Sequence, residues 1–130
     1  MNTRYVMISS SIFMGLLGLS TIFLPVEILN YIGLNSTILP TLLIQITGAL
    51  YLGFALMNWM AKTVLIGGIY SKPLCLGNFL HFTVAGLALI KAAFRNPDLK
   101  YILIAAIAYS IFAILFGLVL FTSPIKNKRQ

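Results

Sequence analysis

Residues 101–121, YILIAAIAYSIFAILFGLVLF, form an uninterrupted run without a single charged side chain. About 20 mostly apolar residues in an α-helix cross the hydrocarbon core of a bilayer, which is roughly 30 Å thick. The basic residues of this region lie at the two ends of the run, as flanking charges of membrane spans do. The stretch therefore predicts a transmembrane helix over about residues 99–121.

Three further segments have the same character, and none contains an acid or a base except Lys91, in the last turn of residues 74–94. The first is longer than the roughly 7–15 apolar residues of a signal peptide and has no small-residue cleavage site, so we expect it to be a retained helix. We predict an all-α integral membrane four-helix bundle, with residues 1–130 as a single transmembrane domain. Its other three helices cover about residues 5–24, 38–60 and 74–94.

The composition supports a surface that faces lipid. The chain is 60% hydrophobic and 8% charged, whereas soluble domains carry roughly 25% charged residues. The net charge of +7 does not indicate nucleic-acid binding, because the bases form no stripe with interleaved aromatic residues. We expect a lipid bilayer as the environment and no nucleic-acid partner.

The distribution of bases predicts the orientation. Four spans place both termini on one side, together with the loop of residues 61–73. That side carries six Lys and Arg residues, and the other side carries Lys91, Arg95 and Lys100. An excess of bases marks the cytoplasmic side, so we expect both termini in the cytoplasm of a bacterium, with the chain in its inner membrane.

Short polar segments mark the ends of the spans. Thr37 or Ser36 is suited to cap the second helix, and residues 96–98, Asn-Pro-Asp, are typical of a helix start, which predicts that they begin the fourth helix. Residues 25–35 leave two interpretations open, an amphipathic helix at the headgroup boundary or a loop with one helical turn.

Pairs of small residues four apart, such as Ser11/Gly15, Ala49/Gly53 and Ala106/Ser110, favour close helix packing.

Five residues form the candidate ligand site. Asn58 and Trp59 lie near the predicted cytoplasmic end of the second helix, and Asn78 and His81 share a face near the same end of the third. Tyr70 lies in the loop between these helices. We predict that the five converge in a polar pocket near the inner leaflet. The alternative is structural: the two asparagines would hydrogen-bond each other, and Trp59 and Tyr70 would be ordinary interface residues.

Several chemistries find no support in the sequence. Cys75 is the single cysteine, so an internal disulfide or dithiol pair is excluded. No His, Cys or carboxylate cluster has metal-ligand spacing, and one histidine gives poor support for haem. We therefore predict no metal, no cofactor and no catalytic residue.

Longer stretches resemble a known group of small bacterial membrane proteins. These are residues 15–33 with the motif FLPVEILNYIG, residues 45–55 (QITGALYLGFA), residues 58–62 (NWMAK), residues 66–71 (IGGIYS) and residues 77–81 (GNFLH). They are similar to the DoxX/DoxD-like proteins. The resemblance implies a four-helix inner-membrane fold, and some relatives are linked to quinone or thiol redox systems. Because Cys75 is the single cysteine in this sequence, the chain lacks the second thiol that a dithiol role would need.

Three functions follow as expectations. The first is binding of an apolar ligand, a lipid or a quinone, or an accessory role beside another membrane protein, because the spans lack charge. The second is an oligomeric transporter or channel, which would need several copies to build a polar path. The third, ranked last, is a membrane enzyme that uses His81.

Overall fold

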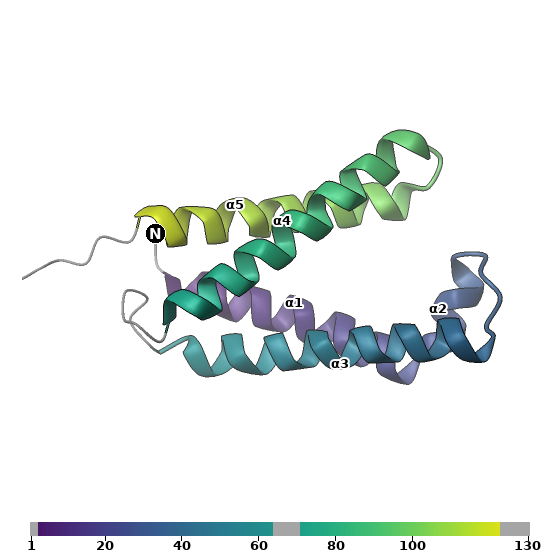
Figure 1. The fold of residues 1–130 in the computed structure, drawn as a ribbon, viewed down its shortest axis with the longest axis horizontal. Coiled ribbons are helices and arrows are strands. Elements are labelled where there is room, and N and C mark those ends of the chain that lie inside the picture. Colours follow the sequence, from purple (N-terminus) through teal and green to yellow (C-terminus); the bar gives the residue numbers. More distant parts are fainter. Residues whose placement is uncertain (1–2, 64–70, 123–130) are drawn as a thin grey trace, which may run out of the picture. The chain divides into compact units, whose positions relative to one another are not determined.

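The structure is a computed structural model that describes residues 3–63 and 71–122, and these residues form five helices and no strand (Figure 1). The all-α class predicted from the sequence is confirmed.

The chain divides into two compact units, Met7–Lys62 and Thr63–Gln130 with Met1–Val6. The first unit holds most of α1 together with α2 and α3, and the second holds α4 and α5. The helices are α1 (Thr3–Phe23), α2 (Pro25–Tyr31), α3 (Ile38–Ala61), α4 (Ser71–Arg95) and α5 (Lys100–Thr122).

Four of the helices have the length and composition of membrane spans. α1, α3, α4 and α5 contain 21, 24, 25 and 23 residues and are apolar enough to cross a bilayer. At 1.5 Å per residue, each is roughly 30 Å long or more. Large apolar side chains are widely exposed on them, for example Ile38 at 87% and Ile104 at 67%. Lipid chains cover such surfaces, and the protein is a multi-pass membrane protein.

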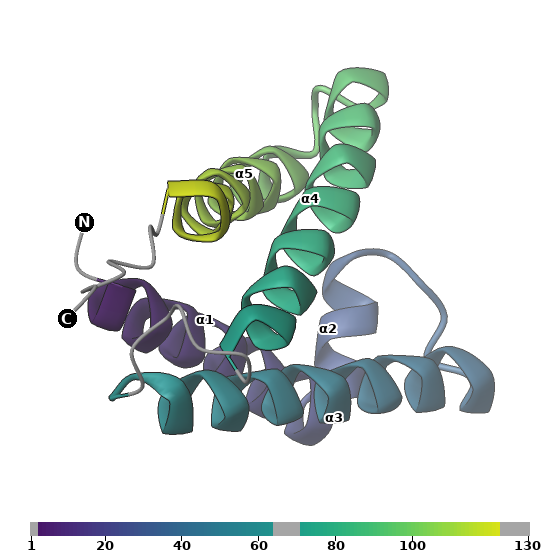
Figure 2. The ribbon, with the colours of Figure 1, turned by 60° about the vertical axis from the view of Figure 1, so that its left-hand side comes forward.

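α1 and α3 lie side by side because glycine lets their backbones approach closely (Figure 2). A Cβ atom added to Gly18 would lie 2.9 Å from the Gly48 carbonyl oxygen and 3.0 Å from the Leu52 nitrogen. Ser11 and Gly15, a predicted small pair, belong to this contact: the Ser11 hydroxyl donates to the Ala55 carbonyl oxygen (2.7 Å).

On α3 the contact surface is not the predicted small pair. Gly48 and Ala55 are buried and face α1, whereas Ala49 is exposed and nothing lies within 4 Å of a Cβ atom added to Gly53. Gly48 precedes Ala49 directly, so a rotation of about 100° about the helix axis separates the observed face from the predicted one.

Several hydroxyl groups of the described spans bond within their own helix. Each donates to a carbonyl oxygen four residues earlier, which satisfies the donor in an environment without water. The bonds run from Thr21 to Leu17 (2.8 Å), from Thr47 to Leu43 (2.8 Å), from Ser110 to Ala106 (2.7 Å) and from Thr122 to Leu118.

Residues 25–31 form a helix of about two turns, and its location at the headgroup boundary stays a prediction. α2 begins with Pro25 at its N-terminus and packs against α3, with Leu29 buried. It ends at Tyr31 with Ile32 as the C-cap, and the next residue, Gly33, has a φ of 77° in the left-handed region. The Gly33 N–H donates to the Asn30 carbonyl (3.1 Å) and the Leu34 N–H to the Leu29 carbonyl (2.9 Å), the pattern of a Schellman cap.

α4 and α5 form a helical hairpin around one aromatic side chain. Phe82 is fully buried, and its ring stacks on Phe112 and Phe116 at centroid distances of 4.9 and 5.7 Å. Tyr109 meets the same ring edge-on at 5.3 Å. Figure 2 shows that the two helices cross at an angle and separate with distance from the turn that joins them.

The turn between these helices corrects one sequence prediction. Asn96-Pro97-Asp98 was expected to start the fourth helix, but α5 begins at Lys100. The Asn96 side chain donates instead to the Ala92 carbonyl (3.1 Å), so it caps the end of α4. The Leu99 N–H bonds the Asn96 carbonyl, and the three residues therefore form a turn. At the other predicted cap, Thr37 occupies the N-cap position of α3, but its side chain makes no capping hydrogen bond.

Candidate functional site

Asn58 and Trp59, two of the predicted site residues, lie near the C-terminal end of α3. Asn58 is fully buried and its amide donates to the Ser10 hydroxyl oxygen (3.1 Å), which links α3 to α1. Trp59 is 46% exposed, and the Lys62 ammonium lies 3.1 Å above its ring centroid. This pairing suits an aromatic residue at a membrane interface.

Asn78 and His81 lie in α4, in the other compact unit. Asn78 is fully buried and donates to the Leu74 carbonyl oxygen (2.9 Å). The His81 ring packs edge-on against Phe82 (5.2 Å) and beside Tyr109 (5.7 Å), so it belongs to the aromatic cluster of the hairpin. Tyr70 lies outside the described residues. The polar pocket that would join these residues stays a prediction.

Cys75, the single cysteine, is buried in the same hairpin. Its thiol donates weakly to the Phe116 carbonyl oxygen across a distance of 3.8 Å, from α4 to α5. This contact places the sulfur in the packing between the two helices.

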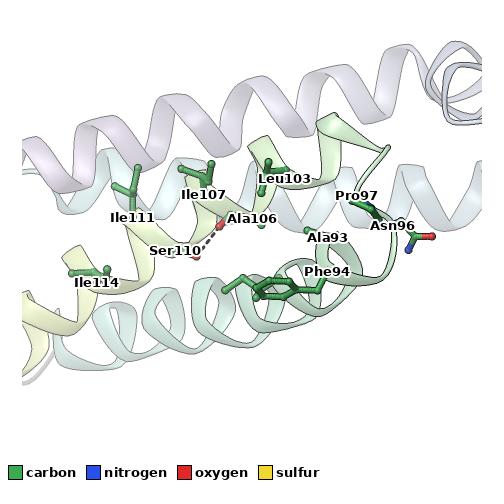
Figure 3. Close-up of a pocket in the computed structure, with 11 residues that line it drawn as sticks. Ala93, Phe94, Asn96, Pro97, Leu103, Ala106, Ile107, Ser110, Ile111 and Ile114 are labelled. Carbon is green, nitrogen blue, oxygen red and sulfur yellow. Dashed lines mark hydrogen bonds between the residues drawn. The ribbon is translucent and has the colours of Figure 1, made fainter.

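A groove between α4 and α5 was not anticipated from the sequence. It has a volume of about 450 Å³, which falls within the range of ligand pockets, roughly 300–1,000 Å³. Ala93, Ala106 and Ser110 line it with small side chains, and Pro97 closes it at the interhelical turn. In Figure 3 the Phe94 ring and the Ser110 hydroxyl lie between the two helices. The remaining lining residues are Ile90, Asn96, Leu103, Ile107, Ile111 and Ile114.

Two more hollows extend this groove along the hairpin. A central hollow of about 150 Å³ shares Ile90, Ser110 and Ile114 with the groove and adds Phe82, Thr83, Gly86, Leu87 and Ala113. A far hollow of about 380 Å³ shares Thr83, Ala113 and Ile114 with the central one and adds Phe79, Gly117, Leu118, Phe121 and Thr122. We call the three together the α4–α5 furrow.

The furrow follows one face of α5. Its α5 residues recur every three or four positions from Leu103 to Thr122, the spacing of a single helix face. These 19 steps correspond to about 28 Å along the helix axis, close to the thickness of the hydrocarbon core.

The chemistry of the furrow is apolar. Of the eleven residues that line the groove, two have polar side chains, Asn96 and Ser110. The Ser110 hydroxyl proton and one Asn96 amide proton are bound to carbonyl oxygens of their own helices, Ala106 and Ala92. The groove is suited to hold hydrocarbon by shape and dispersion, since it presents neither a charged group nor a set of convergent polar groups.

Comparison with known proteins adds no relative: no protein-family model, no curated protein and no solved structure matches this chain. The functional argument therefore rests on the residues and their geometry.

One sequence feature did coincide with the furrow. The small pair Ala106/Ser110 was identified as a packing motif, and in the structure both residues line the groove. Small side chains allow helices to approach, but they also leave space where the facing residues do not fill it. The sequence alone does not distinguish these two outcomes.

Proposed function

We propose that this protein binds an apolar membrane ligand, the chain of a lipid or a quinone, in the α4–α5 furrow. The observation that carries the proposal is the continuity of the three hollows. They share lining residues and extend over about 28 Å of α5, so the furrow matches an extended hydrocarbon chain better than a compact polar substrate.

The proposal has a direct test in native mass spectrometry of the full chain released from mild detergent. Ala93→Phe places a large ring in the groove, and we expect it to reduce the retained ligand by about tenfold, equivalent to roughly 1.4 kcal/mol. Ala88→Phe is the matched control, because Ala88 is exposed on the same helix and does not line the furrow. Equal retention in wild type and Ala93→Phe, with circular dichroism showing intact helices, would refute the proposal.

We also propose that the chain is a DoxX/DoxD-like protein of a bacterial inner membrane, with both termini in the cytoplasm. The motif of residues 77–81 supports the family, and six bases against three support the orientation. In this arrangement the α4–α5 turn faces the periplasm.

Cysteine labelling checks the orientation. In a Cys75→Ser background, Asp98→Cys is expected to react with a membrane-impermeant maleimide in intact spheroplasts. Asn2→Cys is expected to react only after the membrane is permeabilised. The reverse pattern would show that the termini are outside.

A further inference from the structure

We infer that the ligand of the α4–α5 furrow is an anionic phospholipid whose headgroup is bound by Arg95 and Lys100. This inference rests on the proposed function, because it names the class of ligand for the same furrow. It goes further in assigning a polar end to a site that is otherwise apolar.

The charges lie at one end of the furrow. Within residues 91–100 there are three bases, Lys91, Arg95 and Lys100, and one acid, Asp98, and all four are exposed. The groove also ends there, since Asn96 and Pro97 belong both to its lining and to the interhelical turn. An apolar channel with a net positive end is complementary to a molecule with a hydrocarbon chain and an anionic head.

Two of the bases are placed to reach such a head. Lys100 precedes Leu103 by three positions and Ile107 by seven, so it lies on the face of α5 that lines the groove. Arg95 lies in the last turn of α4, between the lining residues Phe94 and Asn96. Long basic side chains at helix ends extend their stems along apolar surface and hold their charge at headgroup level.

The orientation proposed above leaves these bases in need of an explanation. Bases are normally in excess on the cytoplasmic side, yet Lys91, Arg95 and Lys100 all lie near a turn on the opposite side. Headgroup binding accounts for them. A quinone does not, because its head is neutral and would leave the positive end of the furrow without a counter-charge.

The experiment is a lipid competition with the full-length protein. The protein is equilibrated in nanodiscs that contain equal parts of phosphatidylglycerol and phosphatidylcholine with the same acyl chains, and the retained lipid is identified by native mass spectrometry. We expect wild type to retain the anionic lipid about 25-fold over the zwitterionic one, since each of the two bases near the headgroup contributes roughly a fivefold preference.

Three variants separate this inference from the proposed function. Arg95→Gln with Lys100→Gln is expected to retain both lipids equally, whereas Arg95→Lys with Lys100→Arg keeps the preference. The Lys126→Gln, Lys128→Gln variant loses the same amount of positive charge from the C-terminal tail and should keep the preference for the anionic lipid.

The outcomes are distinct. If Ala93→Phe retains as much lipid as wild type, the proposed function fails. If Ala93→Phe loses lipid but wild type shows no preference, or the Arg95→Gln, Lys100→Gln variant keeps its preference, only the headgroup inference is overturned. Retention of a quinone in place of either lipid also overturns it and leaves the furrow as the ligand site.

Discussion

Phe82→Ala is expected to lower the free energy of unfolding by about 2 kcal/mol, because it empties the centre of the α4–α5 hairpin. The ring is fully buried and stacks on Phe112 and Phe116. In a membrane the unfolded helices keep the side chain in hydrocarbon, so little of the usual transfer energy from water is lost. The cavity remains: roughly 100 Å³ at about 24 cal/mol per Å³ gives this value.

Unfolding by SDS in mild detergent, followed by far-ultraviolet circular dichroism, measures this loss. Phe23→Ala is the control, because Phe23 is 74% exposed and faces lipid, and we expect its effect to stay within about 0.5 kcal/mol. Similar losses in the two variants would contradict the assignment of Phe82 to the core of the hairpin.

Gly18→Ala and Gly48→Ala are each expected to lower the free energy of unfolding by about 1–3 kcal/mol, because a Cβ atom at either position collides with the facing helix. At Gly18 the atoms in the way are the Gly48 carbonyl oxygen at 2.9 Å, the Leu52 nitrogen at 3.0 Å and the Leu52 Cγ atom at 2.9 Å. At Gly48 they are the Thr21 hydroxyl oxygen, the Ile22 Cγ1 atom and the Gly18 carbonyl oxygen. The Gly18→Ala, Gly48→Ala double variant should lose less stability than the two single variants together, since both residues form one contact.

Gly53→Ala tests the same substitution on the same helix without the collision. Nothing lies within 4 Å of its added Cβ atom, and alanine favours a helix over glycine by about 1 kcal/mol in water. The variant should therefore be as stable as wild type or slightly more stable in the same SDS titration. A loss equal to that of Gly48→Ala would mean that α1 and α3 do not meet at Gly48.

The membrane-spanning helices were predictable from the sequence because a bilayer imposes a length. The uncharged run of residues 101–121 corresponds to α5, Lys100–Thr122. The turn at Asn96 was predicted differently, because its side chain can bond either the helix before it or the helix after it. In the structure it bonds the Ala92 carbonyl at the end of α4.

Helix faces were harder to predict, for a physical reason. In a soluble protein the buried face of a helix is apolar and the outer face is polar. In lipid both faces are apolar, so nothing in the pattern of α3 distinguishes Gly48 from Ala49. The furrow escaped prediction for the same reason: every residue along α5 is compatible with either hydrocarbon or a neighbouring helix.

Four of the five residues of the predicted site are described, and the structure shows hydrogen bonds or ring contacts for each of them. The Asn58 amide donates to the Ser10 hydroxyl on a neighbouring helix, and the Asn78 amide donates to the Leu74 carbonyl oxygen. Residue type alone does not predict these partners. Any asparagine in hydrocarbon needs hydrogen-bond partners, and the sequence does not show which groups lie within its reach.

The hydrogen bonds within single helices have a consequence for assembly. Thr21, Thr47 and Ser110 each donate to a carbonyl four residues earlier, so these hydroxyl protons need no neighbouring helix when their own helix first enters the bilayer. Insertion can then precede pairing. The hydrogen bonds from Ser11 to Ala55 and from Asn58 to Ser10 form only when α1 and α3 meet. They therefore favour one partner and one register for this pair, while α4 and α5 are held together by stacked aromatic rings and by the Cys75 thiol contact with Phe116.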